Sequence, residues 1–114
     1  MFKEPYYFIG RARNKDVFLT RHAAANIMRY RISVQSIIKT LEKPSEIFRD
    51  TAPPKHRGFK RFCYVKSFRN KYLIVVTEED GLIIVVTSFR ISDRKKYERH
   101  RENKIRRGEW IPYG

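Results

Sequence analysis

The residues that could do chemistry in this sequence are few, and His22 is the strongest acid–base candidate among them. It follows Thr20 and Arg21 at the start of an expected helix, where Thr20 is a suitable N-cap. The positive end of a helix dipole disfavours imidazolium, so an imidazole in the first turn stays available as a base. A capping or partly buried histidine is the alternative for this position. His56 and His100 each stand beside cations and are expected to be solvated.

The charge balance indicates what such residues would meet. The chain has 114 residues, with 26 Lys and Arg against 12 Asp and Glu, a formal net charge of +14, and 41% hydrophobic residues. That size and apolar content predict one folded domain with its own core. An excess of cations this large opposes compaction unless a polyanion offsets it. A nucleic acid, an anionic membrane surface and an acidic protein all qualify as that polyanion, and we expect a nucleic acid, RNA or DNA.

Cations on strands are the second group of candidates, because a guanidinium fork matches the geometry of a phosphate and a strand holds it rigidly. Thr87 and Ser88 point to opposite faces of one expected strand, so at most one of them can share a cleft with His22. The expected catalytic residues are His22, Arg61, Thr87 and Arg90. The residues expected to bind nucleic acid are Arg21, Arg57, Lys60, Tyr64, Arg94 and Lys95. A solvated sheet face is the alternative for each cation, and core packing is the alternative for Tyr64.

Other kinds of site have little support. The single cysteine, Cys63, excludes an internal disulfide and a cysteine-rich zinc site, and its position between aromatic residues indicates a buried packing role. The acidic residues at 78–80 are expected to form a solubilising turn rather than a metal site. We expect no metal and no cofactor, because the sequence has no metal-ligand spacing, phosphate-binding glycine loop or nucleophile motif. The N-terminus lacks the apolar region of a signal peptide, so we expect a cytoplasmic protein without membrane contact.

Capping residues and hydrophobic periodicity predict the elements that position these residues. The second helix is begun by Ser33 and ended by Pro44, which has no backbone N–H to donate. In order, the expected elements are a loop or irregular arm over 10–16, a strand over 16–20, helices over 21–30 and 34–43, an edge strand over 46–50, a loop over 51–58, strands over 59–68, 72–78 and 82–89, and a basic helix over 94–107.

The dipeptide Asp80-Gly81 predicts a type I′ hairpin turn, which pairs Glu79 with Leu82. Leu73, Val75 and Thr77 then share a face with Ile84, Val86, Ser88 and Arg90. Both faces of this hairpin are apolar, so its strands are expected to be covered on two sides.

The predicted fold class is α+β, with the order β-α-α-β-β-β, an antiparallel sheet, two N-terminal helices and a basic C-terminal helix or arm. We assign residues 1–92 to the α+β domain and residues 93–114 to a basic helical arm with an aromatic tail. The apolar residues at 110–113 are expected to dock back onto the sheet.

The order of five short motifs resembles a widespread family of small prokaryotic and viral domains whose fold is placed with the RelE-like toxins, in the set that groups the barnase, EndoU, colicin and RelE ribonucleases. The motifs are Thr20-Arg21-His22-Ala23, Ile32-Ser33-Val34, Leu41-Glu42-Lys43-Pro44, Arg61-Phe62-Cys63-Tyr64 and Val85-Val86-Thr87-Ser88. The resemblance covers residues 17–93. It implies a metal-independent endoribonuclease of toxin type, in which the ribose 2′-OH attacks the adjacent phosphorus, and an acidic antitoxin-like partner protein. No glutamate base of the barnase kind is evident.

Two alternatives stand beside this hypothesis. One is a non-catalytic nucleic-acid-binding protein of the same fold, viral or regulatory, that uses its positive charge alone. The other is a protein-interaction module whose two-sided apolar hairpin pairs with another chain or forms a homodimer.

Overall fold

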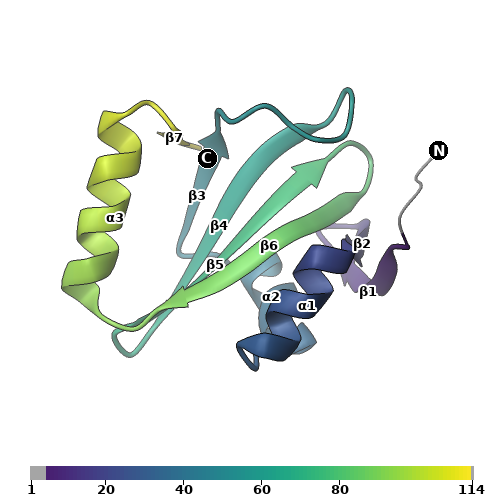
Figure 1. Cartoon of the computed structure of the whole chain (residues 1–114), viewed down its shortest axis with the longest axis horizontal. Helices are drawn as coiled ribbons and strands as arrows, with labels where there is room; N and C mark the ends of the chain where they lie inside the picture. Colours follow the sequence, from purple (N-terminus) through teal and green to yellow (C-terminus); the bar gives the residue numbers. More distant parts are fainter. Residues whose placement is uncertain (1–4, 114) are drawn as a thin grey trace.

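A single mixed sheet organises the chain in the computed structural model, which describes residues 5–113 (Figure 1). The elements are β1 (Tyr7–Ala12), β2 (Lys15–Leu19), α1 (Arg21–Arg29), α2 (Val34–Glu42), β3 (Glu46–Asp50), β4 (Lys60–Phe68), β5 (Lys71–Glu79), β6 (Ile83–Ile91), α3 (Arg94–Arg106) and β7 (Trp110–Pro112). The sheet has seven strands in the order β1-β2-β6-β5-β4-β3-β7. All its neighbouring strands are antiparallel except β2 and β6, which are parallel.

The predicted α+β class is therefore confirmed, but the order β-α-α-β-β-β and the purely antiparallel sheet are wrong. The stretch 10–16, expected to be a loop or irregular arm, belongs to the hairpin of β1 and β2. At the other end of the sheet, β7 pairs with β3, so β3 is not the edge strand that was expected. The RelE-like arrangement is not confirmed, because the strand count differs.

Both N-terminal helices begin where their capping residues predict. The Thr20 hydroxyl accepts from the backbone N–H of Ala23 at 3.0 Å, and the Ser33 hydroxyl accepts from that of Ser36 at 3.0 Å. The buried residues of α1 and α2 pack on one face of the sheet. The apolar ones are Ala23, Ile27, Ile37 and Leu41, and they meet Tyr64, Val75, Ile83 and Val85.

The opposite face is covered by α3 and by the segment that follows it (Figure 1). Tyr97 and Trp110 are buried there with Phe48, Ile74 and Ile84. The ring of Trp110 stacks on that of Phe48 at 4.6 Å. Docking of the apolar C-terminal residues onto the sheet thus takes the form of a short strand. No helix in the described part of the chain has the length and apolar character needed to cross a membrane.

The hairpin turns differ from the prediction. Asp80-Gly81 does not form a two-residue type I′ turn, because Glu79 pairs with Ile83 across three residues and, of the loop residues, only Gly81 has a positive φ, of 71°. The type I′ conformation, with two successive positive φ angles, occurs instead at Arg69-Asn70 and at Arg13-Asn14. Asparagine tolerates left-handed backbone better than most residues, which explains why a turn of this type needs no glycine here.

The error in register is one residue near the turn and two residues beyond a bulge, and a two-residue error leaves the predicted faces unchanged. Near the turn, Thr77 pairs with Val85 rather than with Ile84. A bulge between Val76 and Thr77 then shifts the register, so the expected pairing of faces holds further along, where Leu73 lies opposite Arg90.

The helices cover only part of the long central strands. Strand β4 has nine residues, about 30 Å, whereas α2 has nine residues, about 14 Å. Figure 1 shows the hairpin that joins β4 to β5 reaching beyond α1 and α2. Along the face of β4 that meets these helices, the side chain changes from buried Tyr64 to partly exposed Lys66 and exposed Phe68. The uncovered end of the sheet therefore carries a surface of a different character.

Candidate nucleic-acid interface

A groove lies where α2 stops covering the ends of β4, β5 and β6. Its volume is about 650 Å³. Its lining residues are Ser36, Lys39, Thr40, Lys66, Phe68, Lys71, Tyr72, Leu73, Arg90 and Ser92. We call this hollow the basic groove, because it is lined by four cations and, within the described part of the chain, by no carboxylate.

Strand pairing brings three of the four cations, Lys66, Lys71 and Arg90, into two adjacent rows of the sheet. Leu73 lies opposite Lys66 on one side and Arg90 on the other, so these three residues form one row across the sheet. Lys71 lies opposite Phe68 in the next row of the same hairpin. The fourth cation, Lys39, comes from α2. The groove therefore gathers positive charge from four elements: α2, β4, β5 and β6.

Two of these cations are held in place by carbonyl oxygens at helix ends. The Lys66 amine donates to the carbonyl of Lys43, just after α2, at 2.7 Å. The Arg90 guanidinium donates to the carbonyls of Tyr30 and Arg31, just after α1, at 2.9 and 3.2 Å. Carbonyls at helix C-termini carry partial negative charge, which favours cations there. These contacts orient Lys66 and Arg90 but leave their positive charges without a counter-charge among residues 5–113.

The amines of the other two cations, Lys39 and Lys71, are free to bind a ligand. Both residues are exposed, and neither side chain has a hydrogen bond or an ion pair with any of residues 5–113. An ammonium group in this position neutralises a phosphate without first breaking an internal contact.

An exposed aromatic ring stands at the rim of the basic groove. The side chain of Phe68 is 67% exposed, and the Arg69 guanidinium lies over its ring at 5.3 Å. Tyr72, by contrast, stacks on Tyr97 of α3 at 4.1 Å, so one face of its ring is covered. Proteins that bind single-stranded nucleic acids combine an exposed ring with cations, because bases stack on aromatic faces while phosphates contact the charges.

The carboxylates gather on the other side of Tyr72. A neighbouring hollow of about 360 Å³ is lined by Tyr72 and Tyr97 together with Glu46, Glu98 and Glu102, and its single cation is Arg101. That cation is paired with Glu46 at 2.7 Å. The two hollows therefore have opposite charge, and an anionic ligand favours the basic groove.

The predicted catalytic residues lie in three different places. His22 and Thr87 are brought together through Asn26, whose amide lies 3.4 Å from the His22 ring and donates to the Thr87 hydroxyl at 2.8 Å. Arg90 lies in the basic groove. Arg61 points to the opposite face of the sheet, with Cys63 and Glu78. The four residues expected to act together do not form one cluster.

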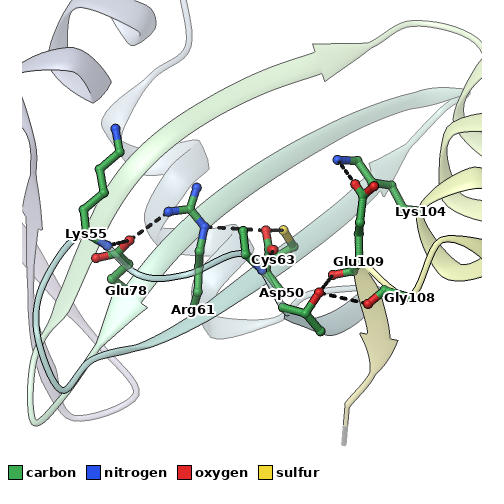
Figure 2. A network of polar contacts seen from close by, with 10 residues as sticks. Asp50, Lys55, Arg61, Cys63, Glu78, Lys104, Gly108 and Glu109 are labelled. Carbon is green, nitrogen blue, oxygen red and sulfur yellow. Dashed lines mark hydrogen bonds and ion pairs between the residues drawn. The ribbon is translucent and has the colours of Figure 1, made fainter.

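Arg61 belongs to a network of buried polar groups (Figure 2). Its guanidinium donates to Glu78 at 2.8 Å and lies 3.6 Å from Asp50. The Glu78 carboxylate is fully buried and also accepts from the backbone N–H groups of Lys55 and His56, at 2.8 and 2.9 Å, and from the His56 ring at 2.5 Å. Arg61 is therefore neutralised from within, although it borders a second hollow of about 340 Å³.

The environment of Glu78 keeps it ionised. Burial works to raise the pKa of this carboxyl, but the hydrogen bonds from Lys55 and from the His56 ring and backbone outweigh it and hold the pKa below its usual value. The imidazole of His56 in turn contacts the Tyr6 hydroxyl at 2.7 Å. This chain of contacts fixes the loop over 51–58 against the sheet, and His56 is not the solvated residue that was expected, since only 11% of its side chain is exposed.

The residues predicted to bind nucleic acid are also dispersed. Tyr64 is 3% exposed and donates to Glu79 at 2.6 Å, so its ring is not accessible to a base. Burial, followed by the neighbouring Glu79, raises the pKa of Tyr64. The others are exposed in separate parts of the fold. Arg21 begins α1, Arg57 lies in the loop before β4, Lys60 begins β4, and Arg94 and Lys95 begin α3.

His100 is the other histidine whose position differs from the prediction. It lies on α3 between the rings of Phe89 and Trp110, at 5.9 and 5.3 Å, rather than in solvent. Burial, with a smaller contribution from Lys104, lowers its pKa, so the ring is neutral near pH 7. It has a packing role. Among the described residues, no group of three or more His, Cys, Asp or Glu is arranged to hold a metal ion.

Sequence reasoning missed four residues of the basic groove: Lys39, Lys66, Phe68 and Lys71. A signal for them was present. Phe62, Tyr64, Lys66 and Phe68 alternate on one face of β4, and the switch from aromatic to cationic marks where the helices stop covering it. Locating Lys39 beside that row requires the packing of α2, which periodicity does not provide.

Comparisons with models of protein families, with curated proteins and with solved structures give no match for this chain. The resemblance to RelE-like domains stays a prediction.

The network in Figure 2 leads to a prediction about Arg61. Replacing Arg61 by Gln removes a partner of the fully buried Glu78 carboxylate, and breaking such a pair typically costs about 3 kcal/mol. We expect urea denaturation to show a fall of that order in the free energy of unfolding, with little change in affinity for RNA. The exposed Arg57→Gln is the matched control and should change stability by less than about 0.5 kcal/mol. A large loss of RNA affinity at unchanged stability would instead make Arg61 a ligand of the nucleic acid.

Proposed function

We propose that this protein binds nucleic acid, RNA in particular, through the basic groove. The observation that supports this most is the lining of the groove: four cations, an exposed aromatic ring and, among the described residues, no carboxylate. Phosphate contacts dominate the affinity of proteins for nucleic acids, because each neutralised phosphate releases condensed counterions. The net charge of +14 adds a long-range attraction for any polyanion.

The arrangement favours binding over cleavage. Metal-independent cleavage of RNA needs a base, an acid and cations around one phosphate. His22 lies on α1 and Thr87 contacts that helix through Asn26, whereas the Arg61 guanidinium is on the opposite face of the sheet and already paired with Glu78. We therefore place the non-catalytic function first and the toxin-type endoribonuclease second. An acidic, antitoxin-like partner stays a prediction from the resemblance.

The double substitution of Lys39 and Lys71 by Gln tests the groove. Both amines are without internal partners among the described residues, so their removal should weaken RNA binding without affecting the fold. Affinity for single strands falls with salt with a slope of about −0.7 for each phosphate neutralised, so the slope should become shallower by about 1.4. Fluorescence anisotropy of a labelled RNA titrated at several salt concentrations measures it.

The matched control carries the same change of charge on another face. Lys96 and Arg99 are exposed on α3, and replacing both by Gln lowers the net charge by the same two units. If this variant weakens binding as much as the groove variant, the attraction is a property of total charge and the basic groove is not the site.

Incubation of RNA with the purified protein in EDTA separates binding from cleavage. We expect the RNA to remain intact while it is bound. The residues that could transfer protons and those that could stabilise a phosphate are not gathered at one site. Gel analysis with detection of 2′,3′-cyclic phosphate ends makes the comparison. Products that carry such ends, and that disappear in the His22→Ala variant, would favour the endoribonuclease instead.

A further inference from the structure

Two exposed aromatic rings, each with an arginine over it, lie at the basic groove or beside it. One is Phe68, 67% exposed, with the Arg69 guanidinium 5.3 Å from the ring centre. The other is Tyr30, 48% exposed, with the Arg29 guanidinium 5.6 Å from the ring centre. Other described rings are also exposed, but only these two have an arginine over them, and this pairing suits a ligand with flat faces and negative charge.

One cation of the groove, Arg90, lies near both aromatic residues. Arg90 lines the basic groove together with Phe68 and donates to the carbonyl of Tyr30 at 2.9 Å. Tyr30 ends α1 as its C-cap, and Phe68 precedes the type I′ turn at Arg69-Asn70. The rings thus stand on separate elements, and Arg90 of the basic groove contacts the backbone of Tyr30.

We propose, as a deepening of the function proposed above and dependent on it, that the ligand is a single-stranded nucleic acid whose bases stack on Phe68 and Tyr30. The bases of a duplex are stacked on one another and expose only their edges in the grooves, so a flat ring has no base face to contact. Unpaired bases present their π-faces, and stacking on aromatic side chains or arginine planes stabilises them. Phe68 has no polar group, so its contribution to binding comes from its ring.

The predicted affinity has two separable parts. Lys39, Lys66, Lys71 and Arg90 contact phosphates, a contribution that depends on salt and is independent of the bases. Phe68 and Tyr30 contact bases, a contribution that needs unpaired bases and varies little with salt. Stacking tolerates any base, so the protein should show weak sequence preference.

The test uses the full-length protein and three ligands of equal phosphate number: single-stranded oligoadenylate, an abasic ribose-phosphate oligomer, and duplex RNA. We expect the single strand to bind most tightly. Phe68→Ala should weaken its affinity at least about fivefold, the change that corresponds to about 1 kcal/mol for one stacked base, and leave the affinity for the abasic oligomer unchanged. Tyr30→Ala should act in the same direction, and Phe68→Trp should retain binding.

Phe8→Ala is the matched control, because Phe8 is 59% exposed on β1, away from the groove, and its loss should change nothing. Circular dichroism checks that each variant is folded. If duplex and single strand bind equally and Phe68→Ala has no effect, while Lys39→Gln/Lys71→Gln still weakens binding, the stacking inference is overturned and the proposed function stands. If the wild-type protein binds none of the three ligands, but does bind polyglutamate or anionic vesicles, both proposals fail.

Discussion

The sheet is longer than the helices that cover it, and the position of the basic groove depends on this mismatch. Strands β4, β5 and β6 have nine residues each, whereas α1 and α2 also have nine residues but rise less than half as far per residue. Where the helices cover the sheet, its residues are apolar and buried, as at Tyr64 and Val75. Beyond them the same face carries Lys66 and Arg90 in one row. The basic groove lies at the boundary between the helix-covered part of the sheet and its uncovered end.

The distribution of carboxylates adds to the difference in charge between the basic groove and the rest of the surface. The chain has only 12 acidic residues, and several of them neutralise cations or hold hydroxyl groups elsewhere in the fold. Glu78 is buried against Arg61, Glu46 pairs with Arg101, and Glu109 pairs with Lys104. These carboxylates lie at the face covered by α3 or beside it. They therefore do not neutralise the positive electrostatic potential of the basic groove. The positive charge of the chain is thereby spread unevenly over the surface and is not offset at the basic groove.

Local sequence signals predicted what depends on neighbours in the chain. Thr20 and Ser33 identified both helix starts, because a capping hydrogen bond spans only three residues. The alternation of apolar residues predicted the three long strands, and Cys63 is buried as its neighbours indicated. Proline at position 44 marked the end of α2. These features need no knowledge of the tertiary fold.

The signals failed where packing over long distances decides. The docking of residues 110–113 onto the sheet was predicted, but periodicity did not reveal that three of them form strand β7, which pairs with β3 where Trp110 stacks on Phe48. The hairpin β1–β2 turns at Arg13-Asn14, a weaker turn signal than the Asp80-Gly81 pair.

The candidate site was missed in the same way. Arginines were assigned to phosphate before their internal partners were known, and Arg61 proved to be paired with Glu78. Composition alone predicted a polyanion as partner. The binding site proposed for that partner follows from where α2 ends relative to the sheet, which composition does not reveal.

Chemical-shift mapping tests the central claim, that the basic groove is the surface that meets nucleic acid. Amide resonances of the labelled protein are followed while a short single-stranded RNA is added. The structure predicts that the largest changes occur in α2 around Lys39, at the Phe68–Lys71 turn and near Arg90, with α3 beyond its first turn little affected, since Arg94 contacts Asn70 of the Phe68–Lys71 turn. Changes concentrated on α3 or on the loop over 51–58 would contradict the account and place the ligand on the opposite face.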